Sequence, residues 1–439
     1  MPITEKAITH LSLLQENSME IRHTSKNGVC VYEYRNPSLH GFYISLFLRS
    51  GNMFESEGEN GITHFLEHIS VRNVNKLMDG KLYSELDKHG IDFNASTFYE
   101  MVQFYVSGAS ENFSFGAKVI TEILSPIVLS AKEIEAERKR IKAEIREGDE
   151  KSSLQAFTSE VVHGKTSLAR PITGTISSVS KITKSALEKF RKRVENTDNI
   201  FFYVSGNFTD GDIQTLLGLI DSRELQKGER NQNIAPVSNN FGNREGKVYV
   251  KSGDYTAVRF TFDLDMTKLS VPVTDLIYDI LFSGYNSKFF IEMSEKRGLF
   301  YDISGAVERY INAGELFFSY EIREKELEAS VELALEILKG IKTELLIEDE
   351  CMKTGYVDNA MMLLDDARDL NFTFAYDNHI MNLGYRDMNE RILAYKNVTP
   401  KEIRAAACQI FTPKNLTLTV KGNKRKIDTE KLSRIIENF

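Results

Sequence analysis

The chain has 439 residues, of which 41% are hydrophobic and 27% are charged, a composition ordinary for a soluble protein of two or more domains. Its formal net charge of −8 argues against a nucleic acid as the partner, because the basic runs in the sequence are short. No segment approaches the ~18 consecutive apolar residues of a membrane span, so we expect neither a membrane anchor nor a membrane partner.

The N-terminal segment and the cysteines together predict a cytoplasmic protein. The first residues lack the basic stretch and apolar run of a secretion signal, and the acids Glu5 and Glu20 are atypical of a mitochondrial targeting peptide. The cysteines Cys30, Cys351 and Cys408 are odd in number and scattered, which is typical of reduced thiols.

The first strands are predicted at residues 28–34 and 42–48, where β-branched and aromatic side chains gather. An acidic loop with three glycines, at residues 51–61, then leads to an H-x-x-E-H pentad at residues 64–68. The pentad lies where a helix is expected to begin.

This pentad predicts a metal site. In a helix, His64 and His68 project from one face one turn apart, and Glu67 borders that face. Neutral imidazoles suit zinc, and a carboxylate beside the metal can take a proton from water whose pKa the metal lowers to about 7. A chain of this composition contains such a pentad by chance only about 0.02 times. We therefore prefer a metal site to the alternative, two partly buried histidines on an amphipathic helix.

Further helices and strands follow the pentad. Residues 75–89 predict a second helix, which Gly90 ends. Alternating apolar residues at 91–97 and 101–106 predict two strands, and residues 113–127 predict another helix.

A catalytic zinc needs a third protein ligand, which must come from another helix. Residues 130–148 predict that helix, because Ser130 and Glu133 form a capping box and an isoleucine stripe follows. Glu137 and Glu144 stand seven apart on one face of it. Alone they would be ordinary solvated charges, but beside the pentad they become candidates for the site.

Two pairs of segments show an internal repeat with a period near two hundred residues. Residues 199–207 parallel residues 415–423, and the helix-to-strand run 82–90 parallels 289–298. This repeat predicts a duplicated domain, and hence two similar α+β halves.

Residues 223–246 lack an apolar period and predict the linker between a first domain at 1–222 and a second at 247–439. The second half has no histidine pair in the corresponding region, so one zinc per chain is expected. The helices predicted to cover its sheet lie at residues 274–282, 287–296, 326–344 and 349–374.

Several motifs resemble the pitrilysin or insulinase-type zinc peptidases, the M16 family with the inverted pentad. Besides the pentad and the two glutamates, they are G-x-x-x-N-A-x-T at 90–97, R-P-I-x-G-T at 170–175 and K-R-G-L-x-Y at 296–301. The resemblance implies two homologous domains, each a mainly antiparallel sheet covered by helices, which form one half of a clamshell.

The resemblance also implies roles for individual residues. Zinc would be held by His64, His68 and Glu144, with Glu67 as the general base and Glu137 as a carboxylate behind the ligands. Asn94 and Ala95 would lie on an edge strand to which an extended substrate adds, and Tyr301 would bind the substrate carbonyl.

The function predicted from these residues is a zinc metalloendopeptidase acting on peptides or unfolded or leader segments in a closed chamber. The alternative is a non-catalytic scaffold or processing-complex subunit of the same fold. A purely structural zinc site would usually be closed by cysteines, and none lies near the pentad.

One departure from the family concerns assembly. The family has an arginine seven residues before the tyrosine, where this chain has Ser294, and Arg297 stands at a different spacing from Tyr301. Because a guanidinium is useful where an oxyanion develops, we expect a related chain to supply it. A heterodimer is therefore favoured over a homodimer.

Overall fold

The computed structural model describes residues 19–148, 153–300, 302–343, 355 and 359–439. The chain divides into two compact units. Unit 1 consists of Met1–Gly148, Arg170–Asn233 and Asn359–Arg391. Unit 2 consists of Asp149–Ala169, Ile234–Asp358 and Ile392–Phe439. The sequence predicts a single division at residues 223–246. In the structure, Asp149–Ala169 from the first half of the sequence also belongs to unit 2, and Asn359–Arg391 from the second half belongs to unit 1.

Unit 1 is built on a six-stranded sheet of order β1-β2-β6-β3-β5-β4, in which only the β2–β6 pair is parallel. Its strands are β1 (Ile21–Thr24), β2 (Cys30–Arg35), β3 (Gly41–Leu48), β4 (Asp92–Thr97), β5 (Val102–Ala109) and β6 (Ile200–Gly206). The sequence predicted β2 to β5 to within about three residues, and β6 lies in the segment 199–207 that takes part in the internal repeat.

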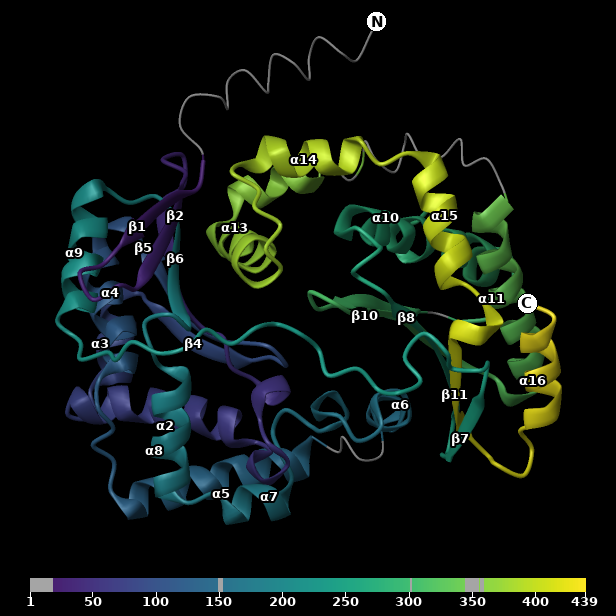
Figure 1. Cartoon of the computed structure of the whole chain (residues 1–439), viewed down its shortest axis with the longest axis horizontal. Coiled ribbons are helices and arrows are strands. Elements are labelled where there is room, and N and C mark those ends of the chain that lie inside the picture. The colour runs from purple at the N-terminus through teal and green to yellow at the C-terminus, as the bar shows by residue number, and fades with distance from the viewer. Residues whose placement is uncertain (1–18, 149–152, 301, 344–354, 356–358) are drawn as a thin grey trace, which may run out of the picture. The chain divides into compact units, whose positions relative to one another are not determined.

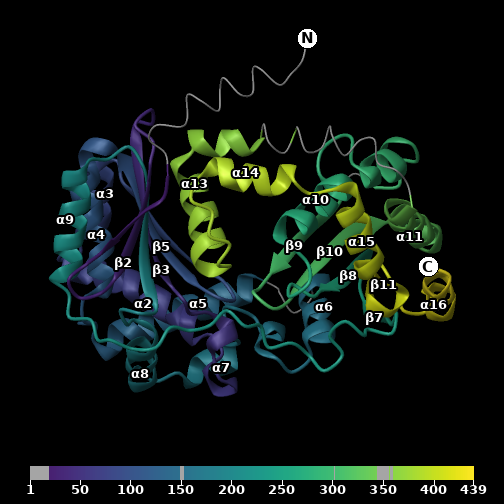
Figure 2. The ribbon, with the colours of Figure 1, turned by 45° about the horizontal axis from the view of Figure 1, so that its top comes forward.

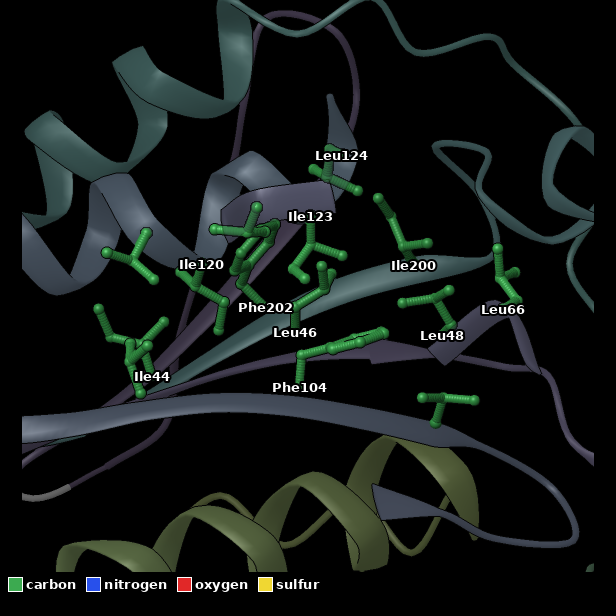
Figure 3. Close-up of a cluster of buried hydrophobic side chains, with 14 of the residues drawn as sticks. Ile44, Leu46, Leu48, Leu66, Phe104, Ile120, Ile123, Leu124, Ile200 and Phe202 are labelled. Atoms are coloured by element: carbon green, nitrogen blue, oxygen red, sulfur yellow. The ribbon is translucent and has the colours of Figure 1, made fainter. Parts of the chain in front are cut away.

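Side chains alternate across this sheet, and one face is apolar. Ile44, Leu46, Phe104 and Phe202 gather on that face, while a helix from residues 367–374 lies on the other (Figure 3). The apolar face packs against the other helices of unit 1, so the main hydrophobic core lies between them and the sheet.

The helices of unit 1 are α2 (Ile62–Leu77), α3 (Leu82–His89), α4 (Phe113–Thr121), α5 (Ala131–Glu147), α7 (Ile176–Lys181), α8 (Lys184–Val194), α9 (Asp210–Asp221), α13 (Ala367–Phe374) and α14 (Met388–Lys396), which runs on into unit 2. Short 3-10 or π turns are η1 (Asn52–Phe54), η2 (Glu57–Glu59), η3 (Ser110–Asn112), η4 (Glu122–Leu124), η9 (Leu363–Asp365) and η10 (Ala375–Ile380). In Figures 1 and 2, the sheet lies between α4 and α9 on one side and α13 on the other.

The helix ends follow local sequence signals. The predicted capping box of Ser130 with Glu133 forms at the start of α5, and Gly90 adopts a left-handed conformation (φ 58°) after α3. The prediction of one helix over 75–89 was wrong at its start. Asp79 and Gly80 both have positive φ (55° and 78°), so the chain turns there and α3 begins at Leu82.

The second face of the sheet in unit 1 is polar and aromatic, and α13 covers it. Asn371 donates to the carbonyl oxygens of Tyr43 (3.3 Å) and Tyr203 (2.9 Å), and accepts from the Ser45 hydroxyl (2.7 Å). Gln103 in turn donates to Ser45 (2.9 Å). This segment comes from late in the chain, and these buried hydrogen bonds fix its place on the sheet.

Unit 2 has a five-stranded sheet of order β7-β11-β8-β10-β9, again with one parallel pair, β7 with β11. Its strands are β7 (Val248–Ser252), β8 (Thr256–Leu264), β9 (Ser304–Arg309), β10 (Gly314–Ile322) and β11 (Leu416–Gly422). The order of connections equals that of β2 to β6 in unit 1, as a duplicated domain predicts. The prediction of two sheets covered by helices is confirmed.

The helices of unit 2 are α6 (Leu154–His163), α10 (Val271–Phe282), α11 (Leu327–Thr343), α15 (Pro400–Ile410) and α16 (Thr429–Glu437). Its short turns are η6 (Ser167–Ala169), the π turn η7 (Phe290–Glu295), η8 (Glu324–Glu326) and η11 (Pro413–Asn415). Helices α10, α11, α15 and α16 bury the apolar face of the sheet. Where the sequence predicted a regular helix over 287–296, the structure has the π turn.

The other face of the sheet in unit 2 carries buried charges, and α6 packs on it. His163 Nε2 lies 3.3 Å from Glu315 Oε2, and Glu315 Oε1 lies 3.4 Å from the Arg259 guanidinium. Thr158 and Thr419 share a hydroxyl hydrogen bond of 2.6 Å. Each unit therefore has a polar sheet face covered by a helix from the other half of the sequence.

Two further predictions can be compared with the structure, one on a helix of the second half and one on membrane spans. The long helix predicted over 349–374 lies partly outside the described residues, and in the described part Asp366 interrupts it, capping α13 through the amides of Arg368 and Asp369. Among the described residues, no helix is both long and apolar enough to cross a membrane.

Candidate active site

The structure brings His64, His68 and Glu144 together in unit 1. Both histidines lie on α2, one turn apart, with ring centroids separated by 4.6 Å. Glu144 reaches them from α5: its Oε1 lies 3.6 Å from His64 Nε2 and its Oε2 lies 3.5 Å from His68 Nε2. Within the described ranges, this is the only group of three or more His, Cys, Asp or Glu side chains with donor atoms close enough to share a metal ion.

These three donors fit zinc. A tetrahedral zinc ion with bonds of about 2.0–2.1 Å holds neighbouring ligand atoms about 3.3–3.4 Å apart, close to the 3.6 Å and 3.5 Å between the Glu144 oxygens and the two imidazoles. The donor set of two imidazoles and one carboxylate leaves a fourth position for water, as in catalytic rather than structural zinc sites. Burial, aided by the neighbouring His68, lowers the pKa of His64 to about 4, so its imidazole is neutral, the form that binds metal.

Glu137 contacts the far nitrogen of one candidate ligand. It is buried on α5, its Oε2 lies 3.4 Å from His68 Nδ1, and its other oxygen pairs with Arg72. Although burial opposes ionisation, the hydrogen bonds from His68 and Arg72 lower the pKa of Glu137. A carboxylate in this place fixes the tautomer and orientation of a metal-binding histidine. The contacts of Glu137 are those of a positioning residue.

His68 experiences the opposite balance to His64. Burial works against its charged form, but the carboxylates of Glu137 and Glu144 outweigh burial and raise the pKa of His68 to about 9. The hydrogen bond from His68, the largest cause, lowers the pKa of Glu144. The two acids therefore hold negative charge around the imidazoles, which favours a cation at this site.

Glu67 lies beside the ligands and is half-buried. The hydroxyl of Thr97, at the end of β4, donates a hydrogen bond to Glu67 Oε2 at 2.7 Å. Burial raises the pKa of Glu67, and the hydrogen bond from Thr97 offsets this only in part. A carboxyl group with a raised pKa next to a metal site is suited to accept a proton during catalysis.

Asn94 and Ala95 lie on β4, the outermost strand of its sheet in the described part of unit 1. They pair with Tyr105 and Phe104 of β5, and the amide of Ala95 donates to the Asn94 side chain (2.9 Å). The strand ends at Thr97, so the edge predicted to bind substrate reaches the candidate base.

The remaining predicted site residue, Tyr301, lies outside the described residues. Nearby in unit 2, the Ser294 hydroxyl donates to the Phe300 carbonyl (3.1 Å). Arg297 is held by Glu292, through its carbonyl oxygen at 2.6 Å and its carboxylate at 3.0 Å.

Sequence reasoning missed Thr97 and Arg72 as partners of the site, and also Glu55, which accepts from the amides of Gly61 and Thr63 at the start of α2. Arg72 stands four residues after His68, a helical spacing that could have shown it on the same face. Thr97 was within a recognised motif, but nothing in a single sequence places its hydroxyl against Glu67. Glu55 lies in a loop whose path no periodicity predicts.

Two protein-family models match the chain. A family described as "Insulinase (Peptidase family M16)" matches residues 31–176, and one described as "Peptidase M16 inactive domain" matches residues 181–352. An "Uncharacterized zinc protease" of Rickettsia felis is 27% identical over 347 residues, 77% of this chain and 82% of that protein. The "Uncharacterized zinc protease YmxG" of Bacillus subtilis is 21% identical over 395 residues, 89% of this chain and 95% of that protein.

Solved structures share the fold. A protease from Helicobacter pylori superposes with a TM-score of 0.82 at 17% identity, covering 93% of this chain and 100% of that one. The first half of the periplasmic protease PqqL from Escherichia coli gives 0.78 at 15% identity, covering 96% and 97%. Against the longer PqqL structure, the match covers 50% of the PqqL chain. At these identities the likeness establishes the fold alone.

Proposed function

Because the chain belongs to the M16 family of peptidases, we propose that it is a zinc metalloendopeptidase. The observation that carries this proposal is the convergence of His64, His68 and Glu144, with the carboxyl group of Glu67 beside them. A scaffold protein has no need of a base next to a metal site.

In this proposal His64, His68 and Glu144 hold the zinc ion, and Glu137 orients His68. Zinc, when bound, lowers the pKa of a water ligand to about 7 and polarises a carbonyl group. Glu67 accepts the proton of the attacking water and delivers it to the leaving amine. Thr97 holds Glu67 Oε2 at 2.7 Å, which leaves Oε1 for this proton transfer.

The substrate class follows from the edge strand. An extended peptide that adds to β4 is bound by main-chain hydrogen bonds with little regard for its side chains. Asn94 and Ala95 would make these contacts, and a substrate carbonyl oxygen would compete with the Asn94 side-chain oxygen for the Ala95 amide. We propose peptides or unfolded or leader segments as substrates, cleaved in the cytoplasm inside a closed chamber.

For assembly, we propose a dimer with a related chain that supplies the second half of the chamber. This is supported by Ser294 in place of the family's arginine, and by Arg297, whose guanidinium is already engaged by Glu292. The match to half of the PqqL chain is compatible with a partner half. Robust turnover of quenched peptides by the single chain, purified alone, assayed at concentrations where it is dimeric and falling on Tyr301→Phe, would contradict the heterodimer.

The second candidate function is a non-catalytic subunit of the same fold. It draws on a structural neighbour from "Complex III2 from Candida albicans", with a TM-score of 0.77 at 15% identity, and on the "inactive domain" family that matches residues 181–352. The complete set of ligands and base favours the peptidase over this alternative.

The test measures bound metal and hydrolysis of a peptide library by the wild type and Glu67→Gln, together with the related partner chain where one is available. We expect about one zinc per chain in both proteins and hydrolysis only in the wild type, because glutamine cannot accept the water proton. Full activity in Glu67→Gln would contradict the mechanism. Zinc binding without any hydrolysis, with and without partner, would favour the scaffold.

A further inference from the structure

The start of α2, which carries both candidate histidines, has no capping side chain of its own. Its N-cap is Gly61, with φ of 87° and no side-chain hydrogen bond to the first turn. The amides of the first turn of a helix lack partners within the helix and need acceptors from elsewhere. For α2 they come from Glu55, seven residues before the helix.

Glu55 is only 5% exposed and binds two amides at once. Its Oε2 accepts from the Gly61 amide and its Oε1 from the Thr63 amide, each at 2.9 Å. His64 is the next residue after Thr63. The Glu55 carboxyl group therefore fixes the backbone one residue before the first candidate ligand.

A second contact, between Gly61 and Gly174, also holds the backbone at the start of α2. A Cβ atom at Gly61 would lie 2.8 Å from the Gly174 Cα, and a Cβ atom at Gly174 would lie 2.8 Å from the Asn60 carbonyl oxygen. Both glycines have positive φ, 87° and 74°. Only glycine at both positions lets the two backbones approach so closely.

Hydrogen bonds join the two loops around this contact. Asn60 Nδ2 donates to the Pro171 carbonyl at 3.0 Å and Asn52 Nδ2 to the Arg170 carbonyl at 2.5 Å. The Arg170 guanidinium returns a bond of 3.0 Å to the Ser56 carbonyl. The R-P-I-x-G-T motif at residues 170–175, which the proposed mechanism does not use, thus holds the loop that starts α2.

We propose that Glu55, Gly61 and Gly174 are positioning residues: the carboxyl group of Glu55 and the close contact of the two glycines place His64 for metal binding. The inference rests on the metal site of the proposed function, but not on peptidase activity. Metal affinity depends on ligand positions to within a few tenths of an ångström, so a shift of the first turn of α2 is felt at His64. An ordinary helix cap, by contrast, would contribute to stability alone.

The experiment measures the zinc dissociation constant by chelator competition for the wild type, Glu55→Gln, Gly174→Ala and a control, Asp212→Asn. Asp212 also caps a helix of unit 1, accepting from the Thr209 amide at 2.9 Å at the start of α9. Circular dichroism establishes that each protein is folded at the temperature used.

We expect Glu55→Gln, and Gly174→Ala where it folds, to weaken zinc binding about 10-fold or more, and Asp212→Asn to leave it unchanged. A folded Glu55→Gln with wild-type affinity, or equal weakening in Asp212→Asn, overturns the inference. Loss of folding in both site variants assigns the contact to stability and also overturns it. If the site variants bind zinc more weakly than the wild type, and the wild type itself cleaves no peptide, the inference is upheld and the peptidase proposal is rejected.

Discussion

The Thr97 hydroxyl and the Glu67 carboxyl group are joined by a hydrogen bond of 2.7 Å. Thr97 ends the edge strand β4, and Glu67 lies on α2 between the two histidines. This bond connects the strand proposed to hold the substrate with the proposed base. In the proposed function, binding of a peptide and placement of the base would be coupled through this one side-chain contact.

Thr97→Val should lower kcat about tenfold or more while zinc content and KM change little. A hydrogen bond to a charged group contributes about 1.5–3 kcal/mol, and each 1.4 kcal/mol of barrier is about tenfold in rate. Thr97→Ser keeps the hydroxyl and should retain most activity. Steady-state kinetics that show the same loss in Thr97→Ser, which keeps the hydroxyl, would contradict this role of the hydrogen bond.

Glu144→Ala should lower zinc affinity, whereas Glu147→Ala should not. Both residues lie in the last turn of α5, but only Glu144 lies within 3.6 Å of both imidazoles. Zinc per chain after dialysis against a weak chelator is the measurement. Equal occupancy in the two variants would remove Glu144 from the site.

Asn371→Ala should lower the free energy of unfolding by about 2–3 kcal/mol, because it leaves the buried Ser45 hydroxyl and two carbonyl groups without this partner. Asp369→Asn, at an exposed position of the same helix, should change it by less than about 0.5 kcal/mol. Urea unfolding followed by circular dichroism makes the comparison. Similar values for both variants would show that α13 contributes little through this asparagine.

The stability of the protein should depend on pH through Glu100. Burial raises the pKa of Glu100 to about 7 from an ordinary 4.5, despite a hydrogen bond with Tyr376. Between these values the folded state binds more protons than the unfolded state, so this group makes stability fall as pH rises through that window.

Glu100→Gln removes this titration, so its unfolding free energy relative to the wild type should rise from pH 5 to pH 8 by about 2–3 kcal/mol. The exposed Glu111→Gln is the control, and the rise in Glu100→Gln between the two pH values should exceed any change in the control. If the difference between Glu100→Gln and the wild type did not change with pH, Glu100 would not contribute to the pH dependence of the unfolding free energy.

Much of the fold was predictable because its signals are local. Strands β2 to β6 follow runs of β-branched and aromatic residues, α5 begins at the capping box of Ser130, and α3 ends at Gly90. The start of α3 was missed because the left-handed conformation of Asp79 is unusual for a residue other than glycine.

The candidate site was predictable only in part. The helical spacing of His64 and His68 needs no tertiary information, and Glu137 and Glu144 came from a resemblance. Thr97, Arg72 and Glu55 act through contacts between separate elements of the fold. Such contacts leave no periodic pattern in a single sequence. The exchange of α6 and α13 between the units was also missed, because it depends on which sheet face each helix covers.

Because α6 and α13 each cover a sheet formed by the other half of the sequence, a fragment that contains one half alone lacks one of these helices. A gene fragment ending near residue 222 would lack Asn371, and its sheet would expose the Ser45 and Gln103 side chains that α13 covers. A fragment beginning near residue 247 would lack His163, leaving Glu315 without that neighbour. The two halves repeat one another in sequence, yet neither is an independent module that can be excised, swapped or expressed alone with its polar sheet face covered.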